Sequence, residues 1–281
     1  MPEGDTIFRA ARTMHRVLAG RIVARFECVY PLVTRAADAH GVVGRAIDSV
    51  TSRGKHLLIN FSGGLALHTH MRMNGSWHLY PDGARWQRPR PDARVLVGCD
   101  GVVAVGFLVP VVELLTDRQL RRHASLRALG PDLLASAFDS ADAAEIAGRA
   151  RARGDEPIGD ILLNQRIAAG IGNVFRSEIL FLAGVDPFRT GASLSDEELG
   201  RIIATARRLL SANVRNDAGS PGRAAGRRTT RSLDPDEKLW VYGRGGRPCR
   251  RCGAVILSKK TGPDARIVYW CSGCQPAMAD G

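Results

Sequence analysis

Cys249-Arg250-Arg251-Cys252 and Cys271-Ser272-Gly273-Cys274 stand near the end of the chain, separated by 18 residues. Each pair lets two thiolates reach one ion from a tight turn, and two such pairs supply the tetrahedral four-sulfur shell that Zn²⁺ prefers. No ligand position is left open for a substrate. We therefore expect one structural Zn²⁺ on Cys249, Cys252, Cys271 and Cys274, in a zinc-finger domain of residues 236–281.

Two disulfide bridges are the alternative use of these four cysteines, and they form mainly in exported proteins. The start of the chain, Met1-Pro2-Glu3-Gly4-Asp5, lacks the basic and then apolar segments of a signal peptide. No apolar run approaches the roughly 20 residues that cross a bilayer. We therefore expect reduced thiols, no membrane association and a cytoplasmic location, with Cys28 and Cys99 as inert thiols in strands.

The segment before the zinc finger has the apolar period of helices. Gly170, Gly172 and Asn173 form a tight turn between two of them. Ser195-Asp196-Glu197-Glu198 has the pattern of a capping box at the start of another. Helices are expected from Thr116 or Asp117 to His123 and over residues 141–150, 157–165, 174–182 and 195–215. The pattern predicts a helical domain over residues 113–235.

Residues 1–112 indicate strands that follow one amphipathic helix. In that helix Ile7, Met14 and Leu18 recur at helical spacing, with Asp5 expected as its cap and Gly20 at its end. Glycine-containing turns then separate β-branched runs. The expected strands are residues 21–27, 46–50, 56–61, 65–71, 77–80, 95–99 and 102–107. This pattern predicts an antiparallel β-sandwich and therefore an α+β multidomain chain.

The net charge of the 281-residue chain is +12, and it is distributed unevenly. Residues 1–112 carry +6, residues 113–212 carry −1 and residues 213–281 carry +7. Basic surfaces of this kind favour a polyanion such as nucleic acid, although a basic zinc ribbon can also dock on a protein. Residues 216–231 contain no apolar side chain larger than Ala, so we expect a mobile basic loop there.

The N-terminus carries a candidate nucleophile. Removal of Met1 would leave Pro2 as a free secondary amine with the carboxylate of Glu3 beside it. An α-amino group has a pKa of about 8, so a useful fraction is neutral at physiological pH and can attack a carbonyl-type carbon. Proline is common at position 2, so the dipeptide alone does not decide the matter.

Four motifs occur in a fixed order along the chain. They are Pro2-Glu3-Gly4, Arg53-Gly54-Lys55-His56-Leu57, Gly170-Ile171-Gly172-Asn173 followed by Ser177-Glu178-Ile179-Leu180, and Tyr242-Gly243-Arg244 leading into the four cysteines and Arg266-Ile267-Val268-Tyr269-Trp270-Cys271. In this order the chain resembles the formamidopyrimidine-DNA glycosylase and endonuclease VIII family of base-excision repair enzymes over nearly its whole length. The resemblance implies a β-sandwich, a helix-two-turn-helix domain and a C-terminal zinc finger, with DNA in a cleft.

The resemblance also implies roles for single residues. Pro2 is the nucleophile that attacks the sugar C1′ and forms a Schiff base, and Glu3 protonates the opening deoxyribose. Lys55, Asn173 and Arg266 are the phosphate contacts around the lesion, Lys55 and Arg266 being counted with the catalytic residues. Met73 matches the residue that fills the space left by the flipped base, a role for an apolar wedge, and the alternative is an ordinary core methionine.

The implied activity is that of a bifunctional DNA glycosylase and abasic-site lyase. Such an enzyme removes oxidised bases from double-stranded DNA and cleaves the strand by β,δ-elimination, here expected as a monomer in the cytoplasm, at the bacterial nucleoid. Gly4-Asp5-Thr6 follows the endonuclease VIII branch, which favours oxidised pyrimidines. The Arg-Phe-Gly wedge of the other branch is not recognisable in Val103–Phe107, so two void-filling residues stay unassigned.

Two other functions are compatible with these features. One is a catalytically silent family member that binds damaged DNA, although a pure binder has no use for the amine of Pro2 beside Glu3. The other is a zinc-ribbon protein that docks on RNA or ribosomes, since a ribosomal protein shares the helix-two-turn-helix element. Comparing affinity for structured RNA with affinity for lesion-containing duplex separates the two.

Overall fold

The computed structural model describes residues 2–215 and 226–277. The chain divides into two compact units, Met1–Ala128 and Leu129–Gly281. Residues 216–225, most of the loop that we expected to be mobile, lie outside the described residues. None of the helices in the described ranges is both long and apolar enough to cross a membrane.

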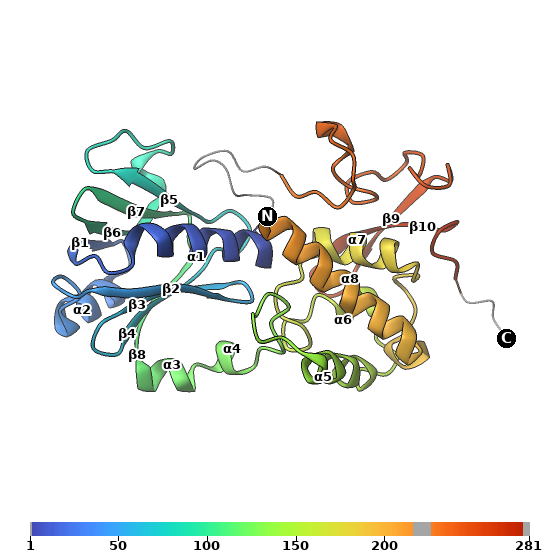
Figure 1. The fold of residues 1–281 in the computed structure, drawn as a ribbon, viewed down its shortest axis with the longest axis horizontal. Coiled ribbons are helices and arrows are strands. Elements are labelled where there is room, and N and C mark those ends of the chain that lie inside the picture. Colours follow the sequence, from blue (N-terminus) through green and yellow to red (C-terminus); the bar gives the residue numbers. More distant parts are fainter. Residues whose placement is uncertain (1, 216–225, 278–281) are drawn as a thin grey trace. The chain divides into compact units, whose positions relative to one another are not determined.

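The first unit is built from two four-stranded antiparallel sheets, with the strand orders β1-β6-β7-β5 and β2-β3-β4-β8. Apolar side chains from both sheets, from helix α1 and from helix α2 share one buried core. Figure 1 shows these two layers and α1 lying along them. The elements are α1 (Gly4–Leu18), β1 (Val23–Cys28), α2 (Pro31–His40), β2 (Ile47–Arg53), β3 (His56–Phe61), β4 (Leu65–His70), β5 (Ser76–Pro81), β6 (Ala93–Cys99), β7 (Val102–Phe107), β8 (Val111–Thr116), α3 (Asp117–Arg122) and α4 (Ala124–Arg127).

Helix α1 forms on the predicted apolar stripe, because Ile7, Met14 and Leu18 are all buried in the core. Its start differs from the expectation. Glu3 occupies the N-cap position, whereas Asp5 lies inside the first turn with its side chain fully buried. The cap assigned to Asp5 was therefore wrong: the helix begins at Gly4, one residue before it.

Helix α1 runs antiparallel to β2. The backbone N–H of Val50 donates to Nδ1 of His15, and the N–H of Gly20 donates to the carbonyl of Ile47. The end of α1 therefore lies beside the start of β2. The start of α1 in consequence lies toward the other end of β2, where the chain turns into β3 (Figure 1).

Helices α2 and α4 and strand β8 of the first unit were not expected. Helix α2 begins with Pro31 at its first turn and ends at Gly41, which has the left-handed φ of 61°. Strand β8 spans residue 112, the expected end of the first domain, and pairs with β4 from Leu65↔Thr116 to His70↔Val111. The first unit consequently continues through α3, where Thr116 and Gln119 form the capping box.

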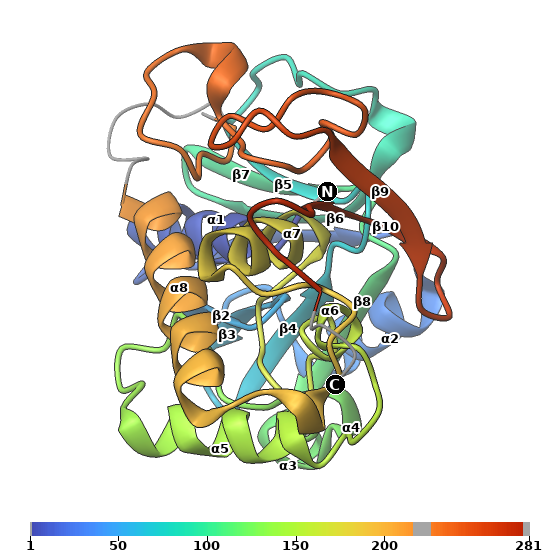
Figure 2. The same ribbon diagram turned by 90° about the vertical axis from the view of Figure 1, so that its right-hand side faces the viewer.

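The second unit packs helix α7 (Asn173–Ala183) against helix α8 (Asp196–Arg215) and strand β10 (Arg266–Cys271) (Figure 2). The expected capping box of α8 is present, because Ser195 Oγ accepts from the N–H of Glu198 and a carboxylate oxygen of Glu198 accepts from the N–H of Ser195. The other elements are α5 (Ser140–Arg151), α6 (Ile158–Ile161) and β9 (Ile256–Thr261), which pairs with β10.

The helix expected over residues 157–165 is only the four-residue α6. Side chains capture the backbone after it: Oδ1 of Asn164 accepts from the N–H of Arg166, and Oε1 of Gln165 accepts from the N–H of Gly170. Such local hydrogen bonds offer the chain an alternative to continuing the helix. They lead it into the turn before α7 instead.

Candidate active site

Three of the predicted site segments lie at one end of the first unit. Pro2 and Glu3 precede α1, whose start lies toward the β2–β3 turn. Lys55 is in that turn, directly after Gly54, whose φ of 58° favours glycine. In the register of β3 and β4, His56 pairs with His70, so the chain that leaves β4 toward Met73 departs from the same end.

Glu3 is the most enclosed of these groups, since none of its surface is exposed, whereas Pro2 and Lys55 are half-buried. The carbonyl of Glu3 accepts from the N–H groups of Thr6 and Ile7 and so fixes the residue to the first turn of α1. An amine followed by a buried carboxylate is an arrangement suited to nucleophilic attack with an internal proton carrier.

Met73 is 58% exposed, which excludes the core methionine that was the alternative interpretation. It sits at the tip of a tight turn in which the N–H of Gly75 donates to the carbonyl of Met71. A Cβ at position 75 would lie 2.5 Å from that carbonyl oxygen, so only glycine fits there. The chain therefore presents an apolar side chain outward on a closed turn.

Asn173 and Arg266, the two predicted phosphate contacts of the second unit, are joined by a residue that the sequence analysis missed. The guanidinium of Arg176 donates to Oδ1 of Asn173 at 2.7 Å and to the carbonyl of Arg266 at 3.3 Å. The amide of Asn173 also donates to the carbonyl of Ile267 at 3.0 Å. The start of α7 and the start of β10 are thereby held in a fixed relation.

Arg176 is completely buried and lies 3.0 Å from Oδ1 of Asp160. Burial lowers the pKa of its guanidinium to about 10, although the carboxylate of Asp160 acts in the opposite direction. The residue therefore stays charged at physiological pH. Only its position three residues after Asn173, one helical turn away on α7, was available in the sequence as a signal.

Replacing Arg176 with Met is expected to destabilise the second unit by about 3–5 kcal/mol, because it leaves a carboxylate without its buried partner. The matched control is Arg201→Met, which removes an exposed pair with Glu197 and is expected to cost below about 1 kcal/mol. Urea unfolding followed by circular dichroism measures both. Equal midpoints for the two variants would contradict the role assigned to Arg176.

Glu178 organises the segment that leads into the cysteines. Its buried carboxylate accepts the backbone N–H groups of Trp240, Val241 and Tyr242 at 2.8–2.9 Å, and it also bonds Thr229 Oγ1. Hydrogen bonds from backbone N–H groups to a carboxylate are shorter and stronger than those between neutral groups. Glu178 thus anchors this segment to α7, a function for the Ser177-Glu178 motif that spacing alone did not reveal.

The four predicted metal ligands come together at the end of the β9–β10 hairpin. Their sulfur atoms lie within 4.8 Å of one another, with Cys249 and Cys274 at 3.9 Å and Cys252 and Cys271 at 3.4 Å. Sulfurs bound at about 2.3 Å to one Zn²⁺ lie about 3.8 Å apart. A Cβ at position 273 would lie only 3.1 Å from the Cys252 sulfur, so a side chain there would crowd the cysteine cluster. This donor set fits a metal ion, and the sulfur–sulfur distances are well beyond the roughly 2.05 Å of a disulfide bond, which favours the metal over the disulfide alternative.

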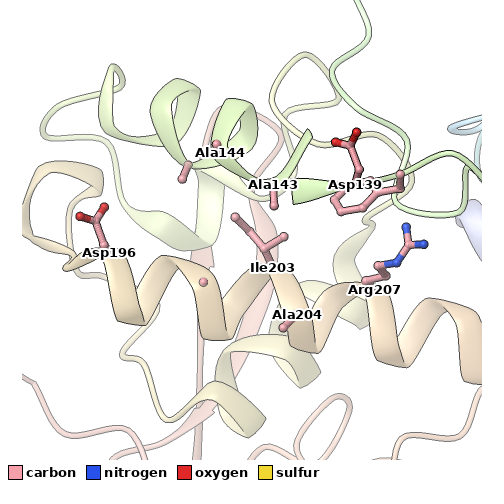
Figure 3. Close-up of a pocket in the computed structure, with 10 residues that line it drawn as sticks. Asp139, Ala143, Ala144, Asp196, Ile203, Ala204 and Arg207 are labelled. Carbon is pink, nitrogen blue, oxygen red and sulfur yellow. The ribbon is translucent and has the colours of Figure 1, made fainter. Parts of the chain in front are cut away.

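A cavity of about 520 Å³ between α5 and α8 does not have the chemistry of a reactive site (Figure 3). Its charged groups already have structural partners. Asp139 accepts from two N–H groups at the start of α5, Asp196 pairs with Arg151, and the guanidinium of Arg207 lies 4.5 Å from the ring centre of Phe138. The rest of its lining is mainly alanine, glycine and isoleucine.

Comparison with known proteins matches both units. The profile of the formamidopyrimidine-DNA glycosylase N-terminal domain matches residues 1–132, and that of the formamidopyrimidine-DNA glycosylase H2TH domain matches residues 129–223. A probable endonuclease 8 2 of Streptomyces coelicolor is 39% identical, covering 99% of this chain and 95% of that protein. The DNA-(apurinic or apyrimidinic site) lyase Nei2 of Mycolicibacterium smegmatis is 34% identical, covering 99% and 100%.

A solved structure shares the fold. The Lactococcus lactis Fpg in complex with DNA containing an abasic site superposes with a TM-score of 0.81 at 21% identity, covering 98% of this chain and 100% of that one. The expected architecture of an N-terminal β domain, a helix-two-turn-helix domain and a C-terminal four-cysteine hairpin is therefore confirmed.

Proposed function

Because the chain belongs to the formamidopyrimidine-DNA glycosylase and endonuclease 8 family of base-excision repair enzymes, we propose that it removes oxidised pyrimidines from double-stranded DNA and then cleaves the strand. The observation that carries the proposal is the placement of Pro2, Glu3, Lys55 and Met73 at one end of the first unit. The relatives named endonuclease 8, together with Gly4-Asp5-Thr6 in this chain, support the pyrimidine branch.

Pro2 performs the first step once Met1 has been removed. Its neutral secondary amine attacks C1′ of the damaged nucleotide, so that a C–N bond forms while the bond from C1′ to the base breaks. The attacking nitrogen loses its proton, and this proton leaves with the base. Glu3, buried beside the amine, donates a proton to the ring oxygen as the sugar opens, and the nitrogen lone pair then forms the iminium.

Strand cleavage follows from the iminium. Loss of a proton from C2′ turns the iminium into an enamine, whose electrons then expel the 3′ phosphate and restore the iminium, and loss of a proton from C4′ expels the 5′ phosphate. Glu3 is the carrier best placed for these proton transfers. Water finally hydrolyses the remaining C–N bond and regenerates the amine of Pro2.

DNA is held by phosphate contacts around the flipped nucleotide. We assign these contacts to Lys55, Asn173 and Arg266, and the space left in the duplex to Met73. The Arg266 side chain already lies 2.9 Å from Asp264, so binding exchanges that carboxylate for a phosphate. This division of labour corresponds to an N-terminal domain, a helix-two-turn-helix domain and a zinc finger, and we move the first boundary from residue 112 to Ala128, where the first unit ends.

We assign one structural Zn²⁺ to Cys249, Cys252, Cys271 and Cys274. When bound it cross-links the two cysteine turns, and its closed sulfur shell leaves the reaction to the side chains at the other end of the chain. Relatives from bacteria and a chromosomal substrate support a location in the cytoplasm, at the nucleoid. A monomer suffices, because a single damaged nucleotide needs no symmetric reader.

A lesion panel tests this function. Duplexes with thymine glycol, dihydrouracil, 8-oxoguanine or an abasic site are incubated with the enzyme, and products are resolved on a denaturing gel. We expect the two pyrimidine lesions to be excised at least about tenfold faster than 8-oxoguanine, which corresponds to about 1.4 kcal/mol of discrimination. Cleaved strands should end in phosphate on both sides of the gap.

Three results of this panel would contradict parts of the proposed function. Faster excision of 8-oxoguanine would overturn the pyrimidine preference but keep the activity. Tight binding of abasic DNA with every strand left intact would identify a catalytically silent binder. Preference for structured RNA over all the duplexes would support the RNA-docking alternative.

A further inference from the structure

Beneath the Lys55 and Met73 turns, the first unit holds a connected chain of side chains that the catalytic steps above do not use. His56 Nδ1 lies 2.7 Å from His68 Nε2, and His68 Nδ1 lies 2.7 Å from Oε2 of Glu113. The same oxygen is 3.0 Å from Nε2 of His123. We call these four residues the histidine chain. They come from β3, β4, β8 and the junction of α3 with α4.

The direction of every hydrogen bond in the histidine chain follows from its carboxylate. An ionised carboxylate only accepts, so Nδ1 of His68 and Nε2 of His123 carry the protons that face Glu113. A neutral His68 then has its lone pair on Nε2, and His56 must donate to it from Nδ1. The His56 ring is thereby fixed in one tautomer and one orientation.

His56, His68 and His70 are neutral at physiological pH. Burial, with the charges of the neighbouring histidines and Arg72, lowers the pKa of His56 to about 3. Burial also lowers the pKa of His68, although Glu113 raises it, and burial with Arg72 and Lys55 lowers the pKa of His70 to about 4. The directions of the hydrogen bonds between His56, His68 and Glu113 therefore stay the same across the physiological pH range.

The same groups are a candidate metal site, because His68, Glu113 and His123 place their ligand atoms within 4.8 Å of one another. A metal needs the lone pair of each imidazole nitrogen that faces it. Nδ1 of His123, however, accepts from the N–H of Leu126, so a neutral His123 carries its proton on the nitrogen that faces Glu113. The ring nitrogens that face Glu113 are therefore engaged in hydrogen bonds and do not offer lone pairs to a metal ion.

The histidine chain reaches both DNA-facing turns. His56 is the first residue of β3 and follows Lys55 directly. Its ring meets the ring of His70 edge to face, with the ring centres 4.8 Å apart. Nδ1 of His70 accepts from the N–H of Arg72 at 3.0 Å, and Arg72 has a φ of 49°, a conformation that a non-glycine residue adopts only when held.

We propose that the histidine chain, extended by the His56–His70 contact, is a rigid base that positions Lys55 and the Met73 turn for damaged DNA. His56 and His70 are positioning residues. Glu113 fixes the tautomer of His68, and His68 in turn fixes the tautomer and ring orientation of His56. The inference rests on the proposed function, since it takes Lys55 and Met73 as DNA contacts. The buried, fully bonded network supplies directional contacts that an apolar filling of the same space would lack.

The test compares two variants at one position. In His56→Gln the side-chain amide can still donate to Nε2 of His68, whereas in His56→Leu the donor is lost. We expect His56→Leu to bind a duplex with a tetrahydrofuran abasic analogue about tenfold more weakly than wild type, and His56→Gln to stay within about twofold. Glu27→Gln, an exposed carboxylate change on β1, is the matched control and should bind as wild type does.

A variant at Glu113 tests the same proposal independently, in case His56→Leu fails to fold. Glu113→Leu removes the oxygen that accepts from both His68 and His123, so the proton of His68 is no longer held on Nδ1 and the tautomer of His56 is no longer set. Ring ¹⁵N NMR of the wild type is expected to show His56 protonated on Nδ1, and the variant is expected to show a mixture of both tautomers. Both proteins should unfold cooperatively, and the variant should bind the analogue about tenfold more weakly.

The outcomes separate the inference from the function on which it rests. A wild type that neither binds the analogue nor excises any base refutes the proposed function itself. An active wild type with His56→Leu binding equally well refutes the histidine chain as a positioning device. Native mass spectrometry that counts a second metal ion, lost in His68→Gln, would also overturn it and assign a metal site instead.

Discussion

An N-terminal extension that joins Pro2 in a peptide bond is expected to lower base excision by at least about a thousandfold, the scale on which removal of a covalent nucleophile acts. The physical reason is that an amide nitrogen has no available lone pair, whereas the free secondary amine does. Borohydride, which reduces the iminium, should trap no covalent complex with abasic DNA. The assay compares extended and free proteins on the same duplex.

The matched control carries the same extension at the C-terminus, where the chain contributes no nucleophile. It should keep full excision and a full trapped band. Binding of a tetrahydrofuran analogue by the N-terminally extended protein would show that the DNA-binding surface survives. Undiminished trapping with Pro2 acylated would transfer the nucleophile to a lysine, with Lys55 the first to examine.

Replacing Cys271 with Ala is expected to release the metal and unfold the β9–β10 hairpin. Cys271 is fully buried beside the Cys252 sulfur, and a structural Zn²⁺ contributes an apparent 10–16 kcal/mol to such small elements, by order of magnitude. Since Arg266 begins β10, lesion binding should fall by about a hundredfold or more. Elemental analysis, circular dichroism and a binding titration measure the three effects.

Cys28→Ala is the control for that experiment. Cys28 is a half-buried thiol on β1, outside the four-cysteine cluster, and burial raises the pKa of its thiol. It should keep one metal ion per chain and wild-type affinity. Retention of the metal and of DNA binding by Cys271→Ala would remove the basis for a structural zinc finger.

The sequence predicted those elements whose signals are local. Turns with glycine and extended β-branched runs located β3 to β7 within a few residues, and the Ser195 to Glu198 pattern located the start of α8. Strand β8 escaped because its alternation, Val111 to Thr116, is short and borders a helix cap at Thr116. Its strand character comes from pairing with β4, which is a tertiary contact.

The residues of the candidate site likewise fall into those recognisable from their sequence neighbours and those that only the fold brings together. The cysteine pairs, Pro2-Glu3 and Asn173 are recognisable because their chemistry is carried by neighbours in sequence. Arg176 and the histidine chain were missed because their partners are distant: Asp160 and Arg266 for the first, Glu113 for His68. A one-residue change of strand register would turn His56, His68 or Glu113 to the opposite face of its sheet, so the spacing of residues in the sequence could not place these three together.

Mass spectrometry of the borohydride-trapped complex tests the central claim most directly. The native protein is trapped on an abasic duplex and digested, and the peptide that carries the DNA remnant is sequenced. The account predicts that Met1 is absent and that the remnant is attached to the nitrogen of Pro2. A remnant on a lysine side chain, or a trapped protein that retains Met1, would contradict it.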